Sequence, residues 1–231
     1  SYDPTYAYEL AVIIQNGLHR MYEKMENVFY YITVMNENYV QPDMPAGVEQ
    51  GIIKGMYLLK ESKKKSKKQV QLLGCGTILR EVIKAAQMLE DDYSITSNIW
   101  SVTSFNELRR EGLAVERYNA MHPDKKPQES YVSMLLKGRQ GPVIAATDYM
   151  RLFADQIRPY VPSQYITLGT DGYGRSDIRE RLRHFFEVDA KYIVLAALNA
   201  LVAEGSIDKS KVVDAMKRYN INSDKLDPIA H

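Results

Sequence analysis

The sequence predicts an α/β protein in which helices cover both faces of a mostly parallel sheet, giving three layers. Short apolar runs alternate with helical patterns from residue 70 onward, and such alternation is typical of βαβ units. The predicted strands are short and apolar, as expected for a sheet that is buried on both sides. A segment with three glycines, 169–174, joins one strand to a helix and provides the tight turn that this connection needs.

The first part of the chain is predicted to hold a helix, a strand, a loop and a helix–strand pair. Apolar residues recur at helical spacing from Tyr6 to Lys24, which predicts an amphipathic helix. The β-branched and aromatic run 28–34 predicts a buried strand. An irregular loop with two prolines follows, and residues 47–61 are expected to form a short helix and then a strand at 55–59.

The lysine-rich segment 60–68 is the best candidate for a domain boundary. Its like charges repel one another and resist burial. Such a run can bind phosphate or nucleic acid, but no aromatic residue is interleaved with these lysines, so a solvated linker is favoured. We therefore expect residues 1–61 to be the tail of one domain, 62–69 to be the linker, and 70–231 to form a second domain.

Residues 70–231 are predicted to alternate between the two kinds of element, assigned from their hydrophobic periods. Strands are expected at 70–73, 98–102, 143–146 and 165–168. Helices are expected at 78–89, 105–118, 131–136, 149–157, 178–187, 191–203 and 209–219.

Composition narrows the class of protein. Apolar residues make up 45% and charged residues 26% of the 231 residues, as in ordinary globular proteins of one or two domains. The formal net charge of +1 gives no reason to expect a nucleic acid or membrane partner. No apolar run approaches the ~20 residues of a membrane span, and no signal-peptide pattern is found. The single Cys75 excludes an internal disulfide and fits a reducing compartment, so we expect a cytoplasmic location.

The chain begins with Ser1 rather than with Met. We therefore expect it to be part of a longer protein.

The glycine-rich segment Gly169–Asp177 predicts a sharp turn between a strand and a helix. We expect Gly172 or Gly174 to adopt a positive φ, which costs glycine nothing sterically. Asp171 and one of the polar residues just before the helix are candidates to cap its free N–H groups.

A second turn, Gly74-Cys75-Gly76, also joins a strand to a helix, where nucleotide-binding folds hold a phosphate. Leu79 replaces the third glycine of that fingerprint, and no acidic residue ends the next strand. A tight structural turn is therefore favoured over dinucleotide binding, with Thr77 helping to cap the helix. Cys75 is expected to be a small buried residue rather than a reactive thiol.

The histidines and two isolated aspartates give only weak evidence for a metal or ligand site. The four histidines are not paired at metal-ligand spacing, so we expect no metal site. His122 is either a loop residue aimed at a cleft or a hydrogen-bonded structural residue. Asp148 follows a predicted strand and has an N-cap role by default. Asp148 and Asp171 both fall near the carboxyl edge of the sheet, where open α/β sheets bind ligands, so a cleft or interface role stays open.

Several long stretches spread over nearly the whole chain share the pattern of one family. They are 6–14, 27–33, 36–39, 70–74, 101–105, 147–150 and 169–189. Together they resemble the homodimeric pyruvate dehydrogenase E1 components, which are transketolase-like thiamine diphosphate enzymes. The resemblance implies a transketolase-type C-terminal domain preceded by the tail of a pyrimidine-binding domain.

The resemblance also implies a function. Enzymes of this family are homodimers linked to glycolysis that use thiamine diphosphate and Mg²⁺, decarboxylate a 2-oxo acid, and pass the acyl group to the lipoyl domain of the E2 acyltransferase. The family's Gly-Asp-Gly motif with its distant Asn is absent from this sequence. The glutamate that activates the aminopyrimidine is expected upstream of Ser1. We therefore expect these residues alone to bind no cofactor or metal and to have no turnover.

One departure from the family falls on Gln15. The resemblance implies an active-site histidine at this position, just before Asn16-Gly17-Leu18. Glutamine can donate and accept hydrogen bonds, but it cannot carry a proton near neutral pH as imidazole can. His19 lies one turn further along the same helix face and is a weak substitute candidate.

Two classes of function follow from the sequence. One is a part of a thiamine-dependent pyruvate dehydrogenase E1, or of a paralogue that acts on another 2-oxo acid. The other is a module for dimerisation or for docking a partner. The catalytic candidate is Gln15, and the candidates for a cleft or an interface are Asn36, Glu37, Asn38, Tyr39, His122, Asp148, Asp171 and Arg175.

Overall fold

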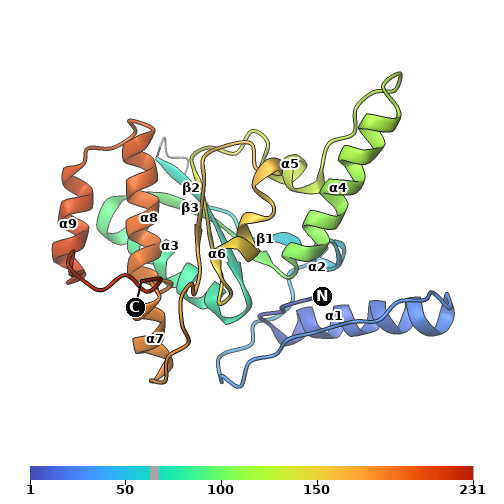
Figure 1. Ribbon diagram of the computed structural model, residues 1–231, viewed down its shortest axis with the longest axis horizontal. Coiled ribbons are helices and arrows are strands. Elements are labelled where there is room, and N and C mark those ends of the chain that lie inside the picture. The colour runs from blue at the N-terminus through green and yellow to red at the C-terminus, as the bar shows by residue number, and fades with distance from the viewer. Residues whose placement is uncertain (63–67, 231) are drawn as a thin grey trace.

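The structure is a computed structural model that describes residues 1–62 and 68–230. Its centre is a five-stranded sheet with the strand order β1-β3-β2-β4-β5 (Figure 1). Strands β2, β3, β4 and β5 are parallel to one another. In the described residues only β1, at one edge of the sheet, runs antiparallel, and it pairs with β3. The strands are β1 Met56–Lys60, β2 Gln69–Cys75, β3 Thr96–Val102, β4 Val143–Ala146 and β5 Tyr165–Leu168.

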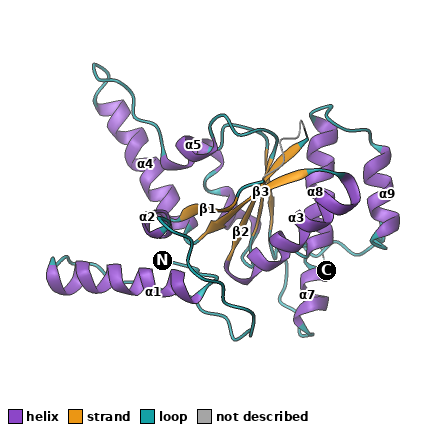
Figure 2. Ribbon diagram, turned by 180° about the vertical axis from the view of Figure 1, so that it is seen from behind, coloured by secondary structure: helices purple, strands orange, loops and turns teal. Residues whose placement is uncertain are grey.

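Helices cover both faces of the sheet, which confirms the three-layer prediction. Neighbouring residues of one strand point to opposite faces, so Leu72 and Leu73 of β2 are both fully buried but belong to different cores. Figure 2 shows α3 and α8 on one side of the strands and α4 and α5 on the other. The first core is closed by α3 (Leu79–Tyr93), α8 (Ala190–Ala203) and α9 (Ser210–Arg218), and the second by α4 (Phe105–Met121), α5 (Tyr131–Leu136) and α6 (Arg151–Asp155).

The strands predicted after residue 70 are confirmed as β2–β5, and the predicted helices as α3–α9, with α7 at Arg179–Phe185. The helix expected at 149–157 is shorter, because a 3₁₀ turn with a proline, Arg158–Tyr160, follows its end. The strand expected at 55–59 is β1, and it pairs with β3 in the same sheet. The sheet therefore includes a strand from before the lysine-rich segment, whose residues 63–67 lie outside the described residues.

The N-terminal segment, residues 1–48, extends to one side of the sheet (Figure 1). It begins with an extended stretch, continues through α1 (Ala7–Leu18) and a π-helical turn (His19–Glu23), and returns along α1; the short α2 (Glu49–Lys54) then leads into β1. The returning chain packs closely on the helix, because Tyr30 contacts Gly17 and donates to Asn16 at 2.7 Å.

The prediction of a strand at 28–34 is wrong. Within the described residues this segment forms only one bridge, between Ile32 and Tyr2. Its pattern is that of a strand, because Phe29 and Tyr31 are exposed while the residues between and beside them are partly buried. A strand also needs a neighbour to pair with, and the stretch that begins with Ser1 offers this one only a single residue.

The turn after β5 lies against the C-terminal tail. Gly172 has a φ of +104°, which confirms the expected positive φ, whereas Gly174 does not. A Cβ on Gly172 would lie 2.0 Å from the carbonyl oxygen of Pro228. The expected capping of α7 by Asp171 is wrong, because its carboxylate accepts instead from the backbone N–H of Arg151 at the start of α6.

Gly172→Ala should lower the free energy of unfolding by more than about 1 kcal/mol, because both the positive φ and the close approach of Pro228 oppose a Cβ. Gly174→Ala is the matched control, since nothing lies within 4 Å of a Cβ there. Denaturant melts of both variants give the comparison. Equal stability of the two variants would contradict this account of the turn.

Candidate functional site

The topology places one crevice at the carboxyl ends of β2 and β4. The chain leaves β2 through α3 toward β3, and it leaves β4 through α6 toward β5 on the opposite face. The two neighbouring strands thus lead away from each other, and open α/β sheets bind their ligands at such a switch point. The residues that fill this crevice decide whether a ligand can enter.

The crevice is filled by the start of the chain itself. Thr5 donates from Oγ1 to the carbonyl oxygen of Gly76, directly after β2, at 2.6 Å. The backbone N–H of Asp3 donates to the carbonyl oxygen of Thr103, after β3, at 2.7 Å. The Asp3 carboxylate accepts from the Tyr149 hydroxyl, after β4, at 2.8 Å. Asp3 and Thr5 are both buried, so the usual ligand position is taken by an internal segment.

A buried carboxylate fixes the first turn of α1 to the sheet. Glu9 is completely buried. It accepts from the backbone N–H of Thr5 and Tyr6 at 2.5 and 2.9 Å. It also accepts from the hydroxyls of Tyr57 on β1 and Ser101 on β3, both at 2.6 Å. Burial, and then the charge of Glu9, raise the pKa of Tyr57 well above its usual range, so this phenol remains a donor.

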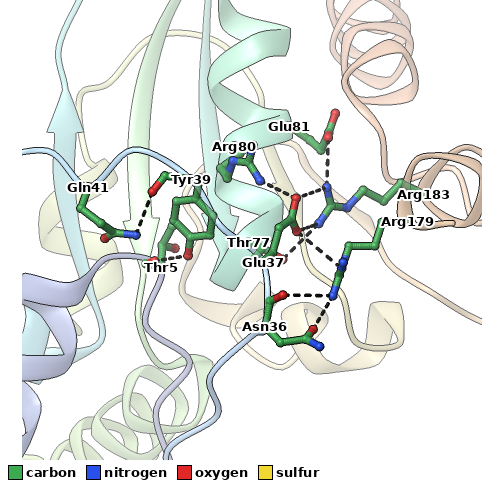
Figure 3. A network of polar contacts seen from close by, with 10 residues as sticks. All are labelled: Thr5, Asn36, Glu37, Tyr39, Gln41, Thr77, Arg80, Glu81, Arg179 and Arg183. Carbon is green, nitrogen blue, oxygen red and sulfur yellow. Dashed lines mark hydrogen bonds and ion pairs between the residues drawn. The ribbon is translucent and has the colours of Figure 1, made fainter.

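A second carboxylate, Glu37, is the centre of a cluster of three arginines (Figure 3). Arg183 of α7 donates to both of its oxygens, with Nη2–Oε2 at 2.6 Å and Nη1–Oε1 at 3.3 Å. Arg80 of α3 donates to Oε1, and the Nε of Arg179 lies 3.8 Å from Oε2. Arg183 also donates to Oγ1 of Thr77 at 3.3 Å, so Thr77 serves this cluster and not the predicted helix cap.

Flanking contacts hold the rest of the loop 36–41 in place. Arg179 donates to the side chain of Asn36. The guanidinium of Arg80 lies over the ring of Tyr39, 4.7 Å from its centroid, as in a cation–π pair. The Tyr39 hydroxyl donates to the carbonyl oxygen of Thr5, which links the loop to the filled crevice.

The two carboxylates beside these arginines titrate in opposite directions. Desolvation raises the pKa of Glu37, but the hydrogen bonds and charges of Arg183 and Arg80 outweigh it, and the pKa is lowered overall. Asp148 lines a neighbouring cavity of about 340 Å³ with Arg175, Arg179 and Arg183. Although the residue is exposed overall, desolvation by the surrounding side chains outweighs the charge of Arg183 and raises the pKa of its carboxyl.

The structure brings together only some of the predicted site residues. Asn36, Glu37 and Tyr39 lie in the arginine cluster, with Asn38 exposed between them. Asp148 and Arg175 line the adjacent cavity. The default N-cap role of Asp148 is wrong, because Met150 is the N-cap residue of α6.

The other candidates lie elsewhere. Asp171 binds Arg151, with Oδ2 at 3.0 Å from Nε. His122 is exposed at the end of α4, where its Nδ1 lies 2.9 Å from the carbonyl oxygen of Tyr118. Gln15 is exposed on α1. The structure thus separates both Gln15 and His122 from the cluster around Glu37.

Sequence reasoning did not indicate Asp3, Glu9, Arg80 or Arg183 as site residues, and it gave Thr77 only a capping role. Arg183 lies in a helix rich in charged residues, which predicts a solvated face, yet it is only 9% exposed. Its spacing of four residues from Arg179 places both on one helix face. That spacing was the available signal, but it does not indicate which carboxylate they meet.

Neither a metal-ligand set nor a reactive thiol accompanies the cluster in the described residues. Within residues 1–62 and 68–230, no group of three or more His, Cys, Asp and Glu side chains is placed to hold a metal ion. Cys75 is buried, as expected, and burial raises the pKa of its thiol. A thiol with a raised pKa is a poor nucleophile.

The comparisons with known proteins agree with this fold. Residues 55–189 match the family model of the transketolase-like TK C-terminal domain, and residues 1–42 match that of the pyruvate dehydrogenase E1 component middle domain. The chain belongs to the transketolase-like C-terminal domain family.

The similar proteins of known identity point to a narrower group within this family. The chain is 61% identical to the pyruvate dehydrogenase E1 component of Pseudomonas aeruginosa over 99% of its length, 57% identical to that of Cupriavidus necator over 100%, and 55% identical to that of Escherichia coli over 99%. It spans 26% of the length of each of these relatives.

Solved structures support the fold alone. A mutant transketolase from Pichia stipitis superposes with a TM-score of 0.59 over 90% of this chain and 26% of its own, at 15% identity. A second mutant of that enzyme gives a TM-score of 0.57 over 87% of this chain and 25% of its own, also at 15% identity. None of the helices in the described part of the chain is long and apolar enough to cross a membrane.

Glu37→Gln should be less stable than the original protein near neutral pH, and the difference should shrink in acid. The folded-state pKa of Glu37 in the original protein is lowered. Ionised Glu37 therefore stabilises the fold above the unfolded-state pKa of about 4.3, and this stabilisation is lost as the pH falls through the folded-state pKa. Urea melts over a pH series measure this difference. A penalty of the same size at every pH would count against the ion cluster.

Asp148→Asn is a control for which we expect the opposite change in stability. Because the folded-state pKa of Asp148 is raised, its ionisation opposes folding above the usual Asp range. The variant should therefore gain stability near neutral pH, and the gain should vanish at low pH, where both states are protonated. A loss of stability at neutral pH would contradict the raised pKa.

Proposed function

We propose that the chain is the C-terminal part of a thiamine-dependent pyruvate dehydrogenase E1, which decarboxylates a 2-oxo acid and transfers the acyl group to the lipoyl group of E2. The supporting observation is the 61% identity over nearly the whole chain to such a component, with the middle-domain and C-terminal-domain matches in sequence order. The chain spans only 26% of that relative, so the activity is proposed for a longer protein. A paralogue acting on another 2-oxo acid is the variant of this proposal that Gln15 suggests.

The domain organisation is part of the proposal. The segment 1–42 would be the tail of the pyrimidine-binding middle domain. We place the boundary before β1 rather than at the lysine-rich segment, because β1 pairs with β3 and the C-terminal-domain match starts at residue 55. The lysine-rich segment then connects two strands of one domain.

Thiamine diphosphate and Mg²⁺ do not fit the residues present here. The Gly-Asp-Gly motif is absent from the sequence, and the switch-point crevice is filled by Asp3 and Thr5. The cofactor is therefore proposed for the preceding domains of the longer protein. In this proposal the present residues hold the tail of the middle domain against the C-terminal sheet.

A role in assembly is the second candidate, and it is compatible with the first. Apolar side chains on the N-terminal segment are widely exposed, including Phe29 at 88% and Val40 at 87%. Such side chains mark surfaces that other chains or domains cover. They support a subunit interface, as in the homodimeric enzyme proposed here. A cytoplasmic location, delivery of the product to E2, and the lack of a nucleic acid or membrane partner are part of the same proposal and rest on the relatives.

Calorimetry of the 231-residue chain with thiamine diphosphate and Mg²⁺ should give no heat of binding, because the ligand positions are filled or missing. The longer natural protein that contains it should bind the cofactor under the same conditions. Circular dichroism on the same sample shows that the shorter chain is folded. Micromolar binding by the folded short chain would overturn the assignment of domains.

Gln15→His in the longer protein should raise turnover of pyruvate and add a pH dependence near the imidazole pKa of about 6.5. A positioned acid–base group typically contributes about 10²–10⁴-fold, which bounds the gain. Gln15→Asn is the control, because it keeps a polar amide that cannot carry a proton. Gln15 is exposed, so both variants should keep their stability. Unchanged rates and pH profiles with pyruvate and longer 2-oxo acids would exclude a catalytic role for this position.

A further inference from the structure

The cluster around Glu37 has the construction of an anion-binding site. Its donors come from the sheet-bearing part of the chain: Arg80 from α3 and Arg183 from α7. Thr77, in the turn after β2, accepts a hydrogen bond from Arg183. The carboxylate that both arginines share is that of Glu37, in the loop 36–41 of the N-terminal segment. Receptor and ligand thus belong to different parts of the chain.

The receptor half is organised without Glu37. The guanidinium of Arg183 also lies 3.5 Å from Oε1 of Glu81, while the other oxygen of Glu81 accepts from the backbone N–H of Ala190 at 3.1 Å. Thr77 is buried and offers its hydroxyl to the same guanidinium. These contacts hold Arg183 in an orientation that presents two N–H groups to a carboxylate, the geometry in which arginine binds carboxylates best.

The buried charge of Arg183 requires a negatively charged partner in the site. Arg183 is only 9% exposed, and removing the partner of a buried charge is strongly destabilising. Without Glu37, Arg183 would keep the carboxylate of Glu81 at 3.5 Å and the nearby Asp148. Arg80 and Arg179 would lose the carboxylate that they share with it. Solvent reaches the cluster through a cavity of about 1200 Å³ on one side and the 340 Å³ cavity on the other, and Arg179 and Arg183 line both. A small anion therefore has a path to the arginines.

We propose that Arg80, Arg179 and Arg183, the last oriented by Thr77, form an anion-binding site whose internal ligand is the carboxylate of Glu37. A small carboxylate such as formate binds there when the Glu37 side chain is removed. The site locks the loop 36–41 of the N-terminal segment to α3 and α7. Because Glu37 is tethered to the site, its effective concentration is high, and free anions do not displace it from the intact protein.

Chemical rescue tests the site in the natural chain that contains these residues. Glu37→Ala should lower the Tm, and sodium formate should restore at least half of the loss with saturation, because a ligand that binds only the folded state stabilises it. Sodium chloride at equal ionic strength should not. Glu37→Gln should not respond to formate, because its amide still fills the site. Glu204→Ala, which removes the same atoms from an exposed position, should show neither the loss nor the rescue.

A double variant tests the receptor half. Arg179→Ala in the Glu37→Ala background should weaken the rescue, so that more formate is needed for the same shift. If Glu37→Ala does not fold without an anion, its refolding yield is measured against formate concentration, and recovery supports the site. Equal formate shifts in Glu37→Ala, Glu37→Gln and Glu204→Ala would overturn the proposal, as would a Glu37→Ala protein that formate neither stabilises nor refolds.

Discussion

The buried carboxylate of Glu9 is the contact on which the placement of the N-terminal segment depends. A carboxylate without solvent contact opposes folding unless donors surround it. Glu9 meets this requirement with two backbone N–H groups at the start of α1 and two hydroxyls, from Tyr57 on β1 and Ser101 on β3. Since the donors come from the helix start and from two strands, only one position of α1 satisfies all of them. A shift of the helix by a single residue would leave the charge unpaired.

Fixing α1 in this way also determines what happens at the carboxyl edge of the sheet. The residues before α1 have to run across the ends of β2 and β3, where Asp3 and Thr5 take the hydrogen bonds that a bound ligand would otherwise take. The Tyr39 hydroxyl then bonds to the carbonyl oxygen of Thr5 and brings the loop with Glu37 to the arginines. The fold of a ligand-binding sheet is thereby used to bind a segment of its own chain.

The positions of the strands were easier to predict from the sequence than the pairing between them. Strands β2–β5 were predictable because their apolar runs are short and separated by helical periods. The antiparallel pairing of β1 was not, since it depends on where residue 56 meets Val102, a contact far apart in the sequence. The run 28–34 has the local pattern of a strand, but local pattern does not supply the neighbour that pairs with it.

The candidate site shows the same division. Glu37 was a candidate through the family resemblance, whereas Arg183 has the sequence context of a solvated helix face. Its burial arises only because α7 packs beside the loop 36–41 and the start of α3. Asp171 was correctly placed at the carboxyl edge, but it caps α6 from across the turn rather than the helix that follows it. Charged residues are hard to assign from sequence, because their partners are chosen by tertiary structure.

The N-terminal segment presents chemically different sides, and this asymmetry bears on its role. Its contacts with the rest of the chain use three carboxylates, those of Asp3, Glu9 and Glu37, while Phe29 and Val40 expose apolar groups to solvent. Buried ionic contacts contribute specificity more than net stability, and the burial of apolar surface contributes most of the free energy of association. The polar side therefore sets where the segment sits on the sheet, and the apolar side is the one from which a covering domain or subunit would gain most.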